Sequence, residues 1–594
     1  MARRWRFFPF DEARISHLER SAGVPSIVAQ LLLCRGITDP AAARGFLEPR
    51  LTGLRDPGAL AGVSEAAEKL AAAAADKKRI VIYGDYDADG ISATAILVRC
   101  LRLLGANVGY YVPSRLEQGY GLNEDALRQL AREGTQTVVT VDCGIASCQE
   151  ALIARELGLE LIVTDHHELA PELPVASCLV HPRLPGRLYP FAGLSGAGVA
   201  FKLAWGVCQA ATRDQRVSQP LRTFLLQAVG LATLGTIADV VPLLDENRIL
   251  VRDGLKRLCQ SPVVGMSALL KITELAHKSE LTSEDVAFSI APRLNAAGRL
   301  GQAQLAVELL TTDSQERATA LAEYLHELNN SRGSLERSVY LAANKQAQDQ
   351  FDPSGDPALV LADVGWHAGV IGIVAGRLVE KYHRPVVLVS FDPVGVKPGI
   401  GSARSIPSFS LHEALAACSD HLLSHGGHAA AAGRKIEEPR LRAFREDFCE
   451  YAAAEIAQEA FTAELFIDAE APLPAITEQV VRQIEQLAPF GQENRRPILC
   501  ATGVRLAEPP QKMGGGGRHL SCKITQAGVS RRAVAFGKGE WAEELAELDG
   551  PIDIAFQPVL NEFRGRVQVE LHLCDWQPSA VGGGLENAVR QNTR

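Results

Sequence analysis

Residues 79–90 read RIVIYGDYDADG, a short apolar run that gives way to acidic residues and glycine. The apolar run is typical of a buried strand, and the change to polar residues and glycine marks the loop that follows it. Two further apolar runs end in the same manner, TVVTVDCG at 137–144 and LELIVTDHH at 159–167. Each predicted strand therefore ends in side chains that can bind a metal ion.

Helical segments separate these runs, so that strands recur about every 25 to 30 residues. We expect helices at 64–75, 92–104, 123–132 and 147–157, and a further strand at 108–113. Such alternation predicts an α/β fold with a parallel sheet covered by helices on both faces. The carboxyl ends of parallel strands share one edge, where such folds bind ligands. The residues expected to meet there are Asp85, Asp87, Asp89, Asp142, Asp165, His166 and His167.

Asp87 and Asp89 lie two residues apart, so on an extended segment their carboxylates point the same way, and Gly90 permits a tight turn into the next helix. One alternative is that these aspartates only cap that helix. Their convergence with Asp142, with His166 and with Asp239, which ends a long apolar stretch, favours a cation as their common partner.

This ligand set is mostly carboxylate with one imidazole, which favours Mn²⁺ with Mg²⁺ as a substitute. The ligands are too many for one ion. Two ions about 3.5 to 4 Å apart stabilise both oxygens of an in-line phosphoryl displacement. The sequence therefore predicts hydrolysis of a phosphoester.

The Asp165-His166-His167 triplet is either a structural hydrogen-bonded cluster or part of the site. Neighbouring side chains at a strand end diverge, so one imidazole can bind metal while the other faces substrate and Asp165 orients a ring. Short polar interruptions at APRLNAAGRL (291–300) and GSARS (401–405) are possible phosphate anchors, although single arginines more often form surface ion pairs. Their polar residues are Arg293, Asn295, Arg299, Ser402 and Arg404.

The rest of the chain predicts further domains. Residues 313–348 indicate a long connecting helix, and the segment from about 358 indicates a second, smaller α/β domain that ends near a small-residue helix, SHGGHAAAAG (424–433). The GGHAAAAG part either packs against nucleic acid or allows close helix packing. Alternating apolar runs at 519–524, 531–536, 551–560 and 566–576 are typical of a small β-barrel.

The bulk composition permits these predictions. The 594 residues are enough for several domains, and the apolar runs fall short of the ~20 residues of a membrane span. The amino terminus lacks a secretory pattern, which predicts a cytoplasmic protein. The 12 cysteines include no Cys-x-x-Cys pair, so we expect buried thiols rather than a zinc ribbon. The net charge of −9 argues against a generally basic DNA-binding surface, but a local basic groove with bound cations can reverse the field.

The motifs YGDYDADG, VDCG, TDHH and IADVVPL occur in the order and spacing of the DHH phosphoesterase superfamily, which the chain resembles. The motifs APRLNAAGR, WHAGVIGIVAGRLVE, GSARS, GGHAAAAG and PFGQENRRP resemble the RecJ family in particular, over about residues 1 to 577. This resemblance implies an N-terminal helical extension (1–60), a DHH catalytic domain (61–310), a connecting helix (311–350), a DHH-associated domain (351–460), an OB-type domain (461–578) and a disordered tail (579–594).

The resemblance also implies an activity: 5′→3′ removal of nucleotides from single-stranded DNA with Mn²⁺ or Mg²⁺, in recombination and repair. It implies that Asp87 binds one metal, that Asp142 bridges both, and that Asp89, His166 and Asp239 hold the second. Asp85 would stand near the first metal and His167 would contact the scissile phosphate. The expected contacts to the 5′ phosphate and backbone are Arg115, Arg293, Asn295, Ser402, Arg404, Gly427 and His428.

A groove on the OB-type domain would bind the strand through Arg531, Arg532, Phe536, Phe556, Arg564 and Arg566. Single-strand-DNA-binding protein and a helicase are family expectations as partners, and a monomer is favoured. His181 departs from the family, in which an Asn is common, and SHGGH replaces a frequent Cys-Gly-Gly-His. Two rivals remain. A DHH phosphodiesterase of short oligonucleotides or cyclic dinucleotides would lack the β-rich terminal region, and a non-catalytic DNA-binding scaffold would have lost carboxylates.

Overall fold

The computed structural model describes residues 3–114, 118–186, 189–212, 216–352, 355–548, 550–563 and 565–579. The chain divides into two units. One contains residues 50–461 with 491–493, and the other contains residues 1–49, 462–490 and 494–594. The predicted disordered tail lies outside the described residues except for Ser579.

The larger unit is built on a five-stranded parallel sheet in the order β3-β2-β4-β5-β6. The strands that carry the quoted motifs, β2 (Arg79–Tyr83), β4 (Thr137–Val141) and β5 (Glu160–Thr164), are neighbours in it, and β3 (Asn107–Tyr111) and β6 (Cys178–Val180) flank them. All five residues of β4 are buried, as expected for a central strand of a parallel sheet. The polar residues that follow these three strands are therefore brought to one edge.

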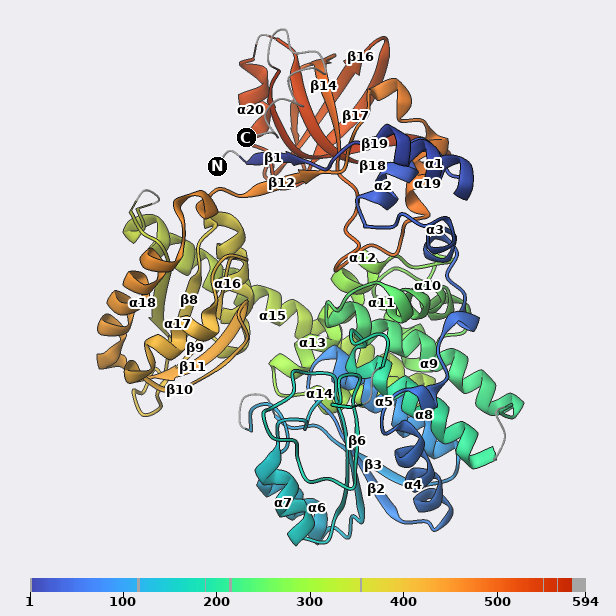
Figure 1. Cartoon of the computed structure of the whole chain (residues 1–594). Helices are drawn as coiled ribbons and strands as arrows, with labels where there is room; N and C mark the ends of the chain where they lie inside the picture. The colour runs from blue at the N-terminus through green and yellow to red at the C-terminus, as the bar shows by residue number, and fades with distance from the viewer. Residues whose placement is uncertain are drawn as a thin grey trace. The chain divides into compact units, whose positions relative to one another are not determined.

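Helices cover both faces of this sheet (Figure 1). One face, with Ile80 and Val139, packs against α4 (Val63–Ala75), α5 (Ala88–Leu103), α8 (Gly196–Thr212) and α9 (Gln219–Ala238). The opposite face, with Val81 and Val138, packs against α6 (Glu124–Arg132) and α7 (Cys148–Glu156). The α/β/α layering confirms the predicted fold class.

Gly90 does not form the turn predicted for it, because it lies inside α5, which begins at Ala88. Its role is steric. A Cβ atom at Gly90 would lie 2.6 Å from the Asp85 Cβ and 2.7 Å from the Asp85 carbonyl oxygen. The absent side chain lets the first turn of α5 pack directly on the acidic loop.

Further helices complete this part of the unit. They are α10 (Asp245–Gln260), α11 (Val264–Ile272), α12 (Ser283–Asp285), a π-helical turn (Val286–Ile290), α13 (Ala291–Arg299) and α14 (Ala303–Thr311). The predicted long helix is α15 (Gln315–Gln350). α9 is long and apolar enough to cross a membrane, but 67% of its most apolar window is buried within the protein, which is typical of a core helix.

The second sheet of this unit has the order β10-β11-β9-β8-β7. Its elements are β7 (Leu359–Val364), α16 (Ala368–Tyr382), β8 (Val386–Phe391), β9 (Gly399–Arg404), α17 (Leu411–Ala417), β10 (Leu422–Gly427), β11 (Ala431–Ile436) and α18 (Leu441–Glu455). β7 and β8 are parallel, while β8, β9, β11 and β10 pair antiparallel.

The helix predicted at 424–433 is wrong, because this segment forms β10, a turn and β11. Gly427 has φ of 136°, a conformation that side-chain-bearing residues rarely adopt, and it breaks any helix there. β11 also pairs with β9 along its whole length. Pairing in the sheet overrides the helix propensity of the alanines.

The smaller unit is a β-barrel with N-terminal helices packed on it. Its seven-stranded sheet has the order β13-β14-β18-β19-β17-β16-β15, and an additional β14–β16 pairing closes it. The four predicted strands are confirmed as β16 (His519–Gln526), β17 (Val529–Ala535), β18 (Ile552–Phe563) and β19 (Arg566–Pro578). The remaining elements are β13 (Ala469–Glu470), β14 (Leu499–Leu506), β15 (Gln511–Met513), α19 (Glu478–Glu485) and α20 (Trp541–Ala546).

The first 49 residues fold with this barrel. β1 (Arg4–Phe7) pairs in parallel with β12 (Glu464–Ile467). α1 (Glu12–Ala22), α2 (Ser26–Leu33) and α3 (Pro40–Leu47) contribute to the same hydrophobic core as the barrel strands. Residues 3–49 and the barrel thus belong to one structural unit.

A buried ion pair in the larger unit joins α8 to α10. The Lys202 ammonium donates to Glu246 Oε1 at 2.6 Å and to the Arg55 carbonyl oxygen at 2.7 Å. Both charged side chains have 0% exposure. α8 begins close to the acidic edge of the sheet, and α10 begins six residues after Asp239, which lies at that edge. The ion pair therefore fixes the positions of two helices that border the acidic edge.

We predict that Lys202→Met lowers the free energy of unfolding by about 3 kcal/mol, since it removes one partner of a buried pair. Lys69→Met is the matched control, because Lys69 pairs with Glu160 where both side chains are about one third exposed. That change should cost under about 1 kcal/mol. Urea unfolding of the two variants measures the difference, and equal values would contradict the structural role of Lys202.

Candidate active site

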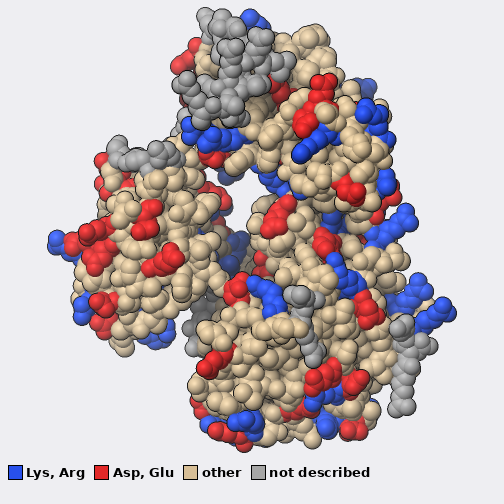
Figure 2. All heavy atoms as spheres, viewed as in Figure 1, with Lys and Arg blue, Asp and Glu red and all other residues tan. Residues whose placement is uncertain are grey.

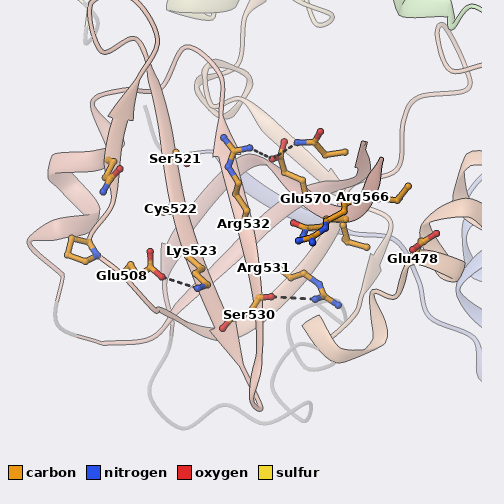
Figure 3. Close-up of a pocket in the computed structure, with 16 residues that line it drawn as sticks. Glu478, Glu508, Ser521, Cys522, Lys523, Ser530, Arg531, Arg532, Arg566 and Glu570 are labelled. Atoms are coloured by element: carbon orange, nitrogen blue, oxygen red, sulfur yellow. Dashed lines mark hydrogen bonds and ion pairs between the residues drawn. The ribbon is translucent and has the colours of Figure 1, made fainter. Parts of the chain in front are cut away.

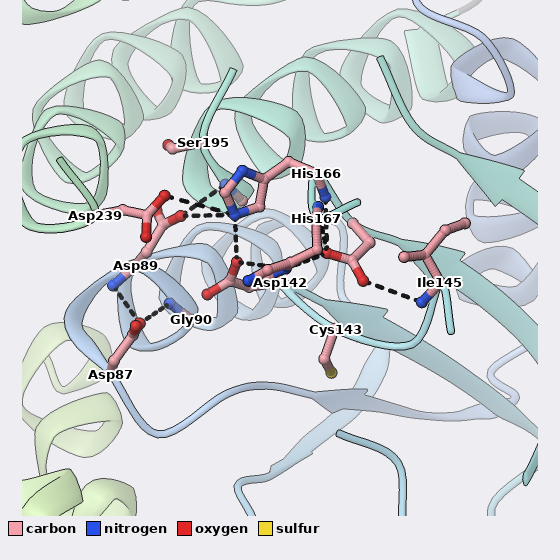
Figure 4. A network of polar contacts seen from close by, with 12 residues as sticks. Asp87, Asp89, Gly90, Asp142, Cys143, Ile145, His166, His167, Ser195 and Asp239 are labelled. Carbon is pink, nitrogen blue, oxygen red and sulfur yellow. Dashed lines mark hydrogen bonds and ion pairs between the residues drawn. The ribbon is translucent and has the colours of Figure 1, made fainter. Parts of the chain in front are cut away.

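The acidic edge of the sheet gathers side chains from four places (Figure 4). Asp85, Asp87 and Asp89 follow β2, and Asp142 follows β4. His166 and His167 follow β5, and Asp239 lies at the C-cap of α9. Asp142, with φ of 63°, and Val240, with φ of 58°, adopt left-handed backbone conformations that non-glycine residues seldom adopt. Such strain is typical of functional sites.

The centre of the site is the contact between His166 and three carboxylates. His166 Nε2 lies 3.0 Å from Asp142 Oδ1, 3.6 Å from Asp239 Oδ2 and 3.9 Å from Asp89 Oδ2. His166 Nε2 and Asp142 Oδ1 are both buried, and neither makes a hydrogen bond. Buried polar atoms without hydrogen bonds are rare, and a shared cation would satisfy both. The residues therefore fit a metal ion.

Three groups of ligand atoms are close enough to hold cations. Asp89, His166 and Asp239 form one, and Asp85, Asp87 and Asp142 form another, with the chosen atoms of each group within 4.8 Å of one another. Asp142 also groups with His166 and His167. Asp142 belongs to two of these groups, and its Oδ1 lies 3.0 Å from His166 Nε2 of the third, so Asp142 is the carboxylate best placed to be shared by two ions.

Burial makes this arrangement costly without a cation. It raises the pKa of Asp142 well above its usual range, with neighbouring carboxylates, Asp89 foremost, adding to the effect. Burial together with Asp87 raises the pKa of Asp89 to about 7, and burial together with Asp89 raises that of Asp239 to about 9. Cations at this site would compensate the repulsion and favour the ionised carboxylates.

The two histidines differ in charge. Burial, with the nearby His167, lowers the pKa of His166 to about 3, so its imidazole is neutral and can bind metal. Although burial alone would lower the pKa of His167, a hydrogen bond to Asp165 raises it to about 9. His167 Nδ1 lies 2.7 Å from Asp165 Oδ1. A proton on Nδ1 is directed at Asp165, which leaves Nε2 as the ring atom able to contact a substrate.

Asp165 supports the site without belonging to either metal group. Its Oδ1 accepts from the His166 and His167 backbone N–H groups, and its Oδ2 accepts from the Ile145 N–H at 3.0 Å. Burial would raise the pKa of Asp165, but the His167 contact and these bonds lower it to about 2. Asp165 is therefore a permanent anion that orients His167.

Tyr120, which lies outside the predicted site residues, contacts the site directly. Its hydroxyl lies 3.1 Å from the Asp142 carbonyl oxygen and 3.0 Å from His167 Nδ1, and its ring meets that of His167 edge-on. The ring remains 50% exposed. The sequence signal for Tyr120 was its position between two glycines in the GYG segment (119–121), because such a segment is typical of a loop that can expose a side chain.

The sequence motifs also do not reveal the groups that surround Asp89. Its two oxygens accept from the Gly196 and Ala197 N–H groups, at 2.7 and 2.9 Å, at the start of α8. A Cβ atom at Gly235 would lie 2.1 Å from Asp89 Oδ1. Asp87 has a double role, because it caps α5 by accepting from the Asp89 and Gly90 N–H groups. The capping alternative and the metal-binding prediction are thus compatible.

The structure places the predicted phosphate-binding residues on several different elements. Asn295 lies at the site, since its Oδ1 accepts from the Ala88 N–H at 2.8 Å. The Arg293 guanidinium instead contacts His326 Nδ1 and the Ser289 carbonyl oxygen. Ser402 and Arg404 lie together on β9, with their side chains against Gly372 of α16. The remaining anchors are Gly427, at the end of β10, the exposed His428 beyond it, and Arg115, which lies outside the described residues.

A parallel sheet whose strand ends gather carboxylates and an imidazole around shared cation positions defines a metal-dependent phosphoesterase. Family models agree: DHH family, N-terminal domain, matches residues 79–233, DHHA1 domain matches 355–454, and RecJ OB domain matches 467–575. The chain belongs to the RecJ family.

Relatives of this family are similar over most of the chain. The single-stranded-DNA-specific exonuclease RecJ of Bacillus subtilis is 36% identical, over 96% of this chain and 70% of that protein. The RecJ of Thermus thermophilus is 38% identical, over 89% of this chain and 72% of that protein. The crystal structure of Thermus thermophilus RecJ in complex with Mn²⁺ matches with a TM-score of 0.81 and 34% identity, covering 98% and 81% of the two chains.

A second Thermus thermophilus RecJ structure, in complex with Mg²⁺, matches with a TM-score of 0.76 and 33% identity, covering 98% of this chain and 79% of that one. Together with the ligand groups described above, these complexes confirm the prediction of Mn²⁺ or Mg²⁺ as cofactor. The chain is therefore a metal-dependent enzyme of this family.

We predict that Gly235→Ala displaces the Asp89 carboxylate and weakens Mn²⁺ binding at least tenfold in a calorimetric titration. Gly230→Ala on the same helix is the matched control, because its Cβ would meet Leu258 without a clash, at 3.3 Å from the side chain and 3.9 Å from the backbone nitrogen. A Gly235→Ala protein that binds Mn²⁺ as the wild type does would show that this close approach is dispensable.

Proposed function

We propose that this chain degrades single-stranded DNA from the 5′ end to mononucleotides, by hydrolysis at a two-metal site. The observation that carries the proposal is the buried contact between Asp142 and His166, whose facing atoms have no hydrogen-bond partner. The DNA substrate is supported by the relatives, which are named single-stranded-DNA-specific exonucleases. The direction of cleavage is supported by the resemblance of the motifs alone.

The metal ligands in this proposal are Asp87 for one ion, Asp142 for both, and Asp89, His166 and Asp239 for the second, with Asp85 beside the first. Two bound divalent cations supply charge neutralisation at the phosphate and a lowered pKa of the attacking water. The Gly196 and Ala197 N–H groups and the Asn295 side chain keep the acidic loop in place. His167, oriented by Asp165 and Tyr120, contacts the scissile phosphate through Nε2.

The 5′ phosphate and adjacent backbone are gripped by Arg115, Arg293, Asn295, Ser402, Arg404, Gly427 and His428. Ser402 and Arg404 have the firmest support, because both polar groups lie on one strand beside a glycine of α16. Arg293 must exchange its His326 contact for a phosphate in order to take part.

A groove on the barrel holds the rest of the strand. It has a volume of about 1010 Å³, and Arg531, Arg532 and Arg566 line it (Figure 3). Phe536 is not among the residues that line this groove. It is 58% exposed and meets the rings of His519 and His572 edge-on, so it can stack on a base outside the groove. The prediction for Phe556 is wrong, because this ring is fully buried in the barrel core, and Arg564 lies outside the described residues.

The overall charge does not prevent DNA binding. Figure 2 shows acidic and basic side chains interspersed on the face that it draws, so the net charge of −9 does not make that face uniformly acidic. Local grooves decide the contact with phosphate.

Several finer points belong to this proposal. The protein acts as a monomer in the cytoplasm, in recombination and repair, with single-strand-DNA-binding protein and a helicase as partners. The domain boundaries follow those expected from the motifs, except that residues 3–49 group with the barrel instead of forming a separate extension to residue 60. A DHH phosphodiesterase of short oligonucleotides is the second candidate, and the RecJ OB match at 467–575 argues against it.

We expect the protein with Mn²⁺ to release the label of 5′-labelled single-stranded DNA as mononucleotide and to spare duplex DNA. Asp142→Ala should abolish cleavage, because both metal positions lose a ligand. Gel or chromatographic analysis of the products over time measures this. Release that starts at a 3′ label would overturn the direction, and activity confined to dinucleotides would favour the second candidate.

Arg404→Ala should reduce the preference for a 5′-phosphorylated over a 5′-hydroxyl end, since a guanidinium binds phosphate in two places. The ratio of kcat/KM for the two substrates is the measurement. Arg442→Ala is the control, because Arg442 is an exposed arginine of the same sheet domain that pairs only with Glu446 among the contacts described. An unchanged ratio would remove Arg404 from the anchor.

A further inference from the structure

The barrel groove contains nearly as much negative as positive charge. Its cations are Lys523, Arg531, Arg532 and Arg566, and its carboxylates are Glu478, Glu508 and Glu570. A groove that only had to attract a polyanion would gain nothing from three carboxylates. The arrangement of the acids therefore needs its own explanation.

Two of the acids are bonded to cations of the groove. Arg532 Nη1 lies 2.6 Å from Glu570 Oε2, and Lys523 Nζ lies 2.9 Å from Glu508 Oε1 (Figure 3). Each carboxylate thus occupies a position on its cation that a phosphate oxygen could take. Glu478 is different, because it pairs with Arg482 of its own helix.

Glu570 is the fixed partner of its pair. Its side chain is 9% exposed, whereas that of Arg532 is 51% exposed. Glu570 also contacts Asn561 Nδ2 at 3.1 Å and His572 Nε2 at 3.2 Å. The parallel pairing of β17 with β19 places Glu570 directly opposite Arg532. The carboxylate is therefore preorganised, and the arginine is the side chain that can move to a ligand.

The Arg532–Glu570 ion pair is not needed to hold β17 against β19. The backbones of β17 and β19 already pair at Arg532, Ala533 and Val534. An ion pair with one half-exposed partner adds little to that, since such pairs contribute about 0 to 1 kcal/mol. The effect on a bound polyanion is larger, because DNA must compete with a carboxylate for the same guanidinium.

We propose that Glu570 and Glu508 compete with DNA phosphates for Arg532 and Lys523, and so limit how tightly the barrel holds single-stranded DNA. This inference rests on the proposed function of the groove. An exonuclease must let the strand advance after each cut, and a groove with internal competitors exchanges one phosphate for the next at low cost. Glu570 and Glu508 are thus affinity-setting residues, distinct from the catalytic site.

The test uses the full-length protein with EDTA, so that DNA is bound and not cut. Fluorescence anisotropy measures the affinity for a labelled oligo-dT over a series of KCl concentrations. Glu570→Gln and Glu508→Gln should each bind severalfold tighter at low salt. Each should also steepen the slope of log K against log[salt] by about 0.7, the increment for one added phosphate contact on a single strand.

Two further comparisons make the outcome decisive. Glu464→Gln removes an exposed pair with Arg6 elsewhere in the same unit and should change neither quantity. In an Arg532→Ala background, Glu570→Gln should bring no gain. Glu508 is 62% exposed, so its variant remains informative even if replacement of Glu570 disturbs the barrel.

DNA binding by the groove and competition by the two glutamates can be refuted separately. If the double variant Arg531→Ala, Arg566→Ala binds as tightly as the wild type, the groove does not bind DNA, and this inference falls with it. If that variant binds weakly while Glu570→Gln and Glu508→Gln retain wild-type affinity and salt slope, only the competition is refuted. A gain of equal size in Glu464→Gln would also refute it, since the cause would then be net charge.

Discussion

The Asp142 carboxylate is 2% exposed and lies beside other buried acids, so its ionised form is costly in free energy. The rest of the site is arranged to compensate this buried charge. An isolated buried charge of this kind is prohibitive unless a cation or hydrogen bonds compensate it. Asp142 Oδ1 has no hydrogen bond, and His166 Nε2, which lies 3.0 Å away, has none either. A bound cation would compensate both atoms, in keeping with the Mn²⁺ and Mg²⁺ complexes of the Thermus thermophilus relative.

The remaining elements serve to hold those charges together. Parallel pairing of β2, β4 and β5 sets the acidic loops side by side. The α8 amino terminus adds N–H donors to Asp89, and Gly196 leaves room for Asp142, whose Oδ1 would lie 2.5 Å from a Cβ there. Small residues around the site are thus a consequence of the crowded carboxylates, because any added methyl group would separate them.

The metal-binding edge could be predicted from the sequence because it depends on order along the chain. Strand, polar loop and helix recur, and parallel strands bring their ends together whatever the details of packing. Tyr120 and Gly235 could not be found this way, since their roles depend on distances of 2 to 4 Å across elements far apart in sequence. The strands β10 and β11 were also missed, because pairing with β9 decides their conformation.

The barrel also combines features that follow from order along the chain with features that depend on contacts between distant residues. Its strands were readable from alternation, but Phe556 and Phe536 look alike in sequence, and only their place in the sheet separates a core ring from an exposed one. The charge pattern is subtler. Arg532 and Glu570 lie 38 residues apart and meet only because β17 and β19 pair in parallel at that register. Counting cations along the chain would overstate the attraction of this groove for DNA. A binding surface is defined by the cations left after internal pairing, and that quantity exists only in the folded protein.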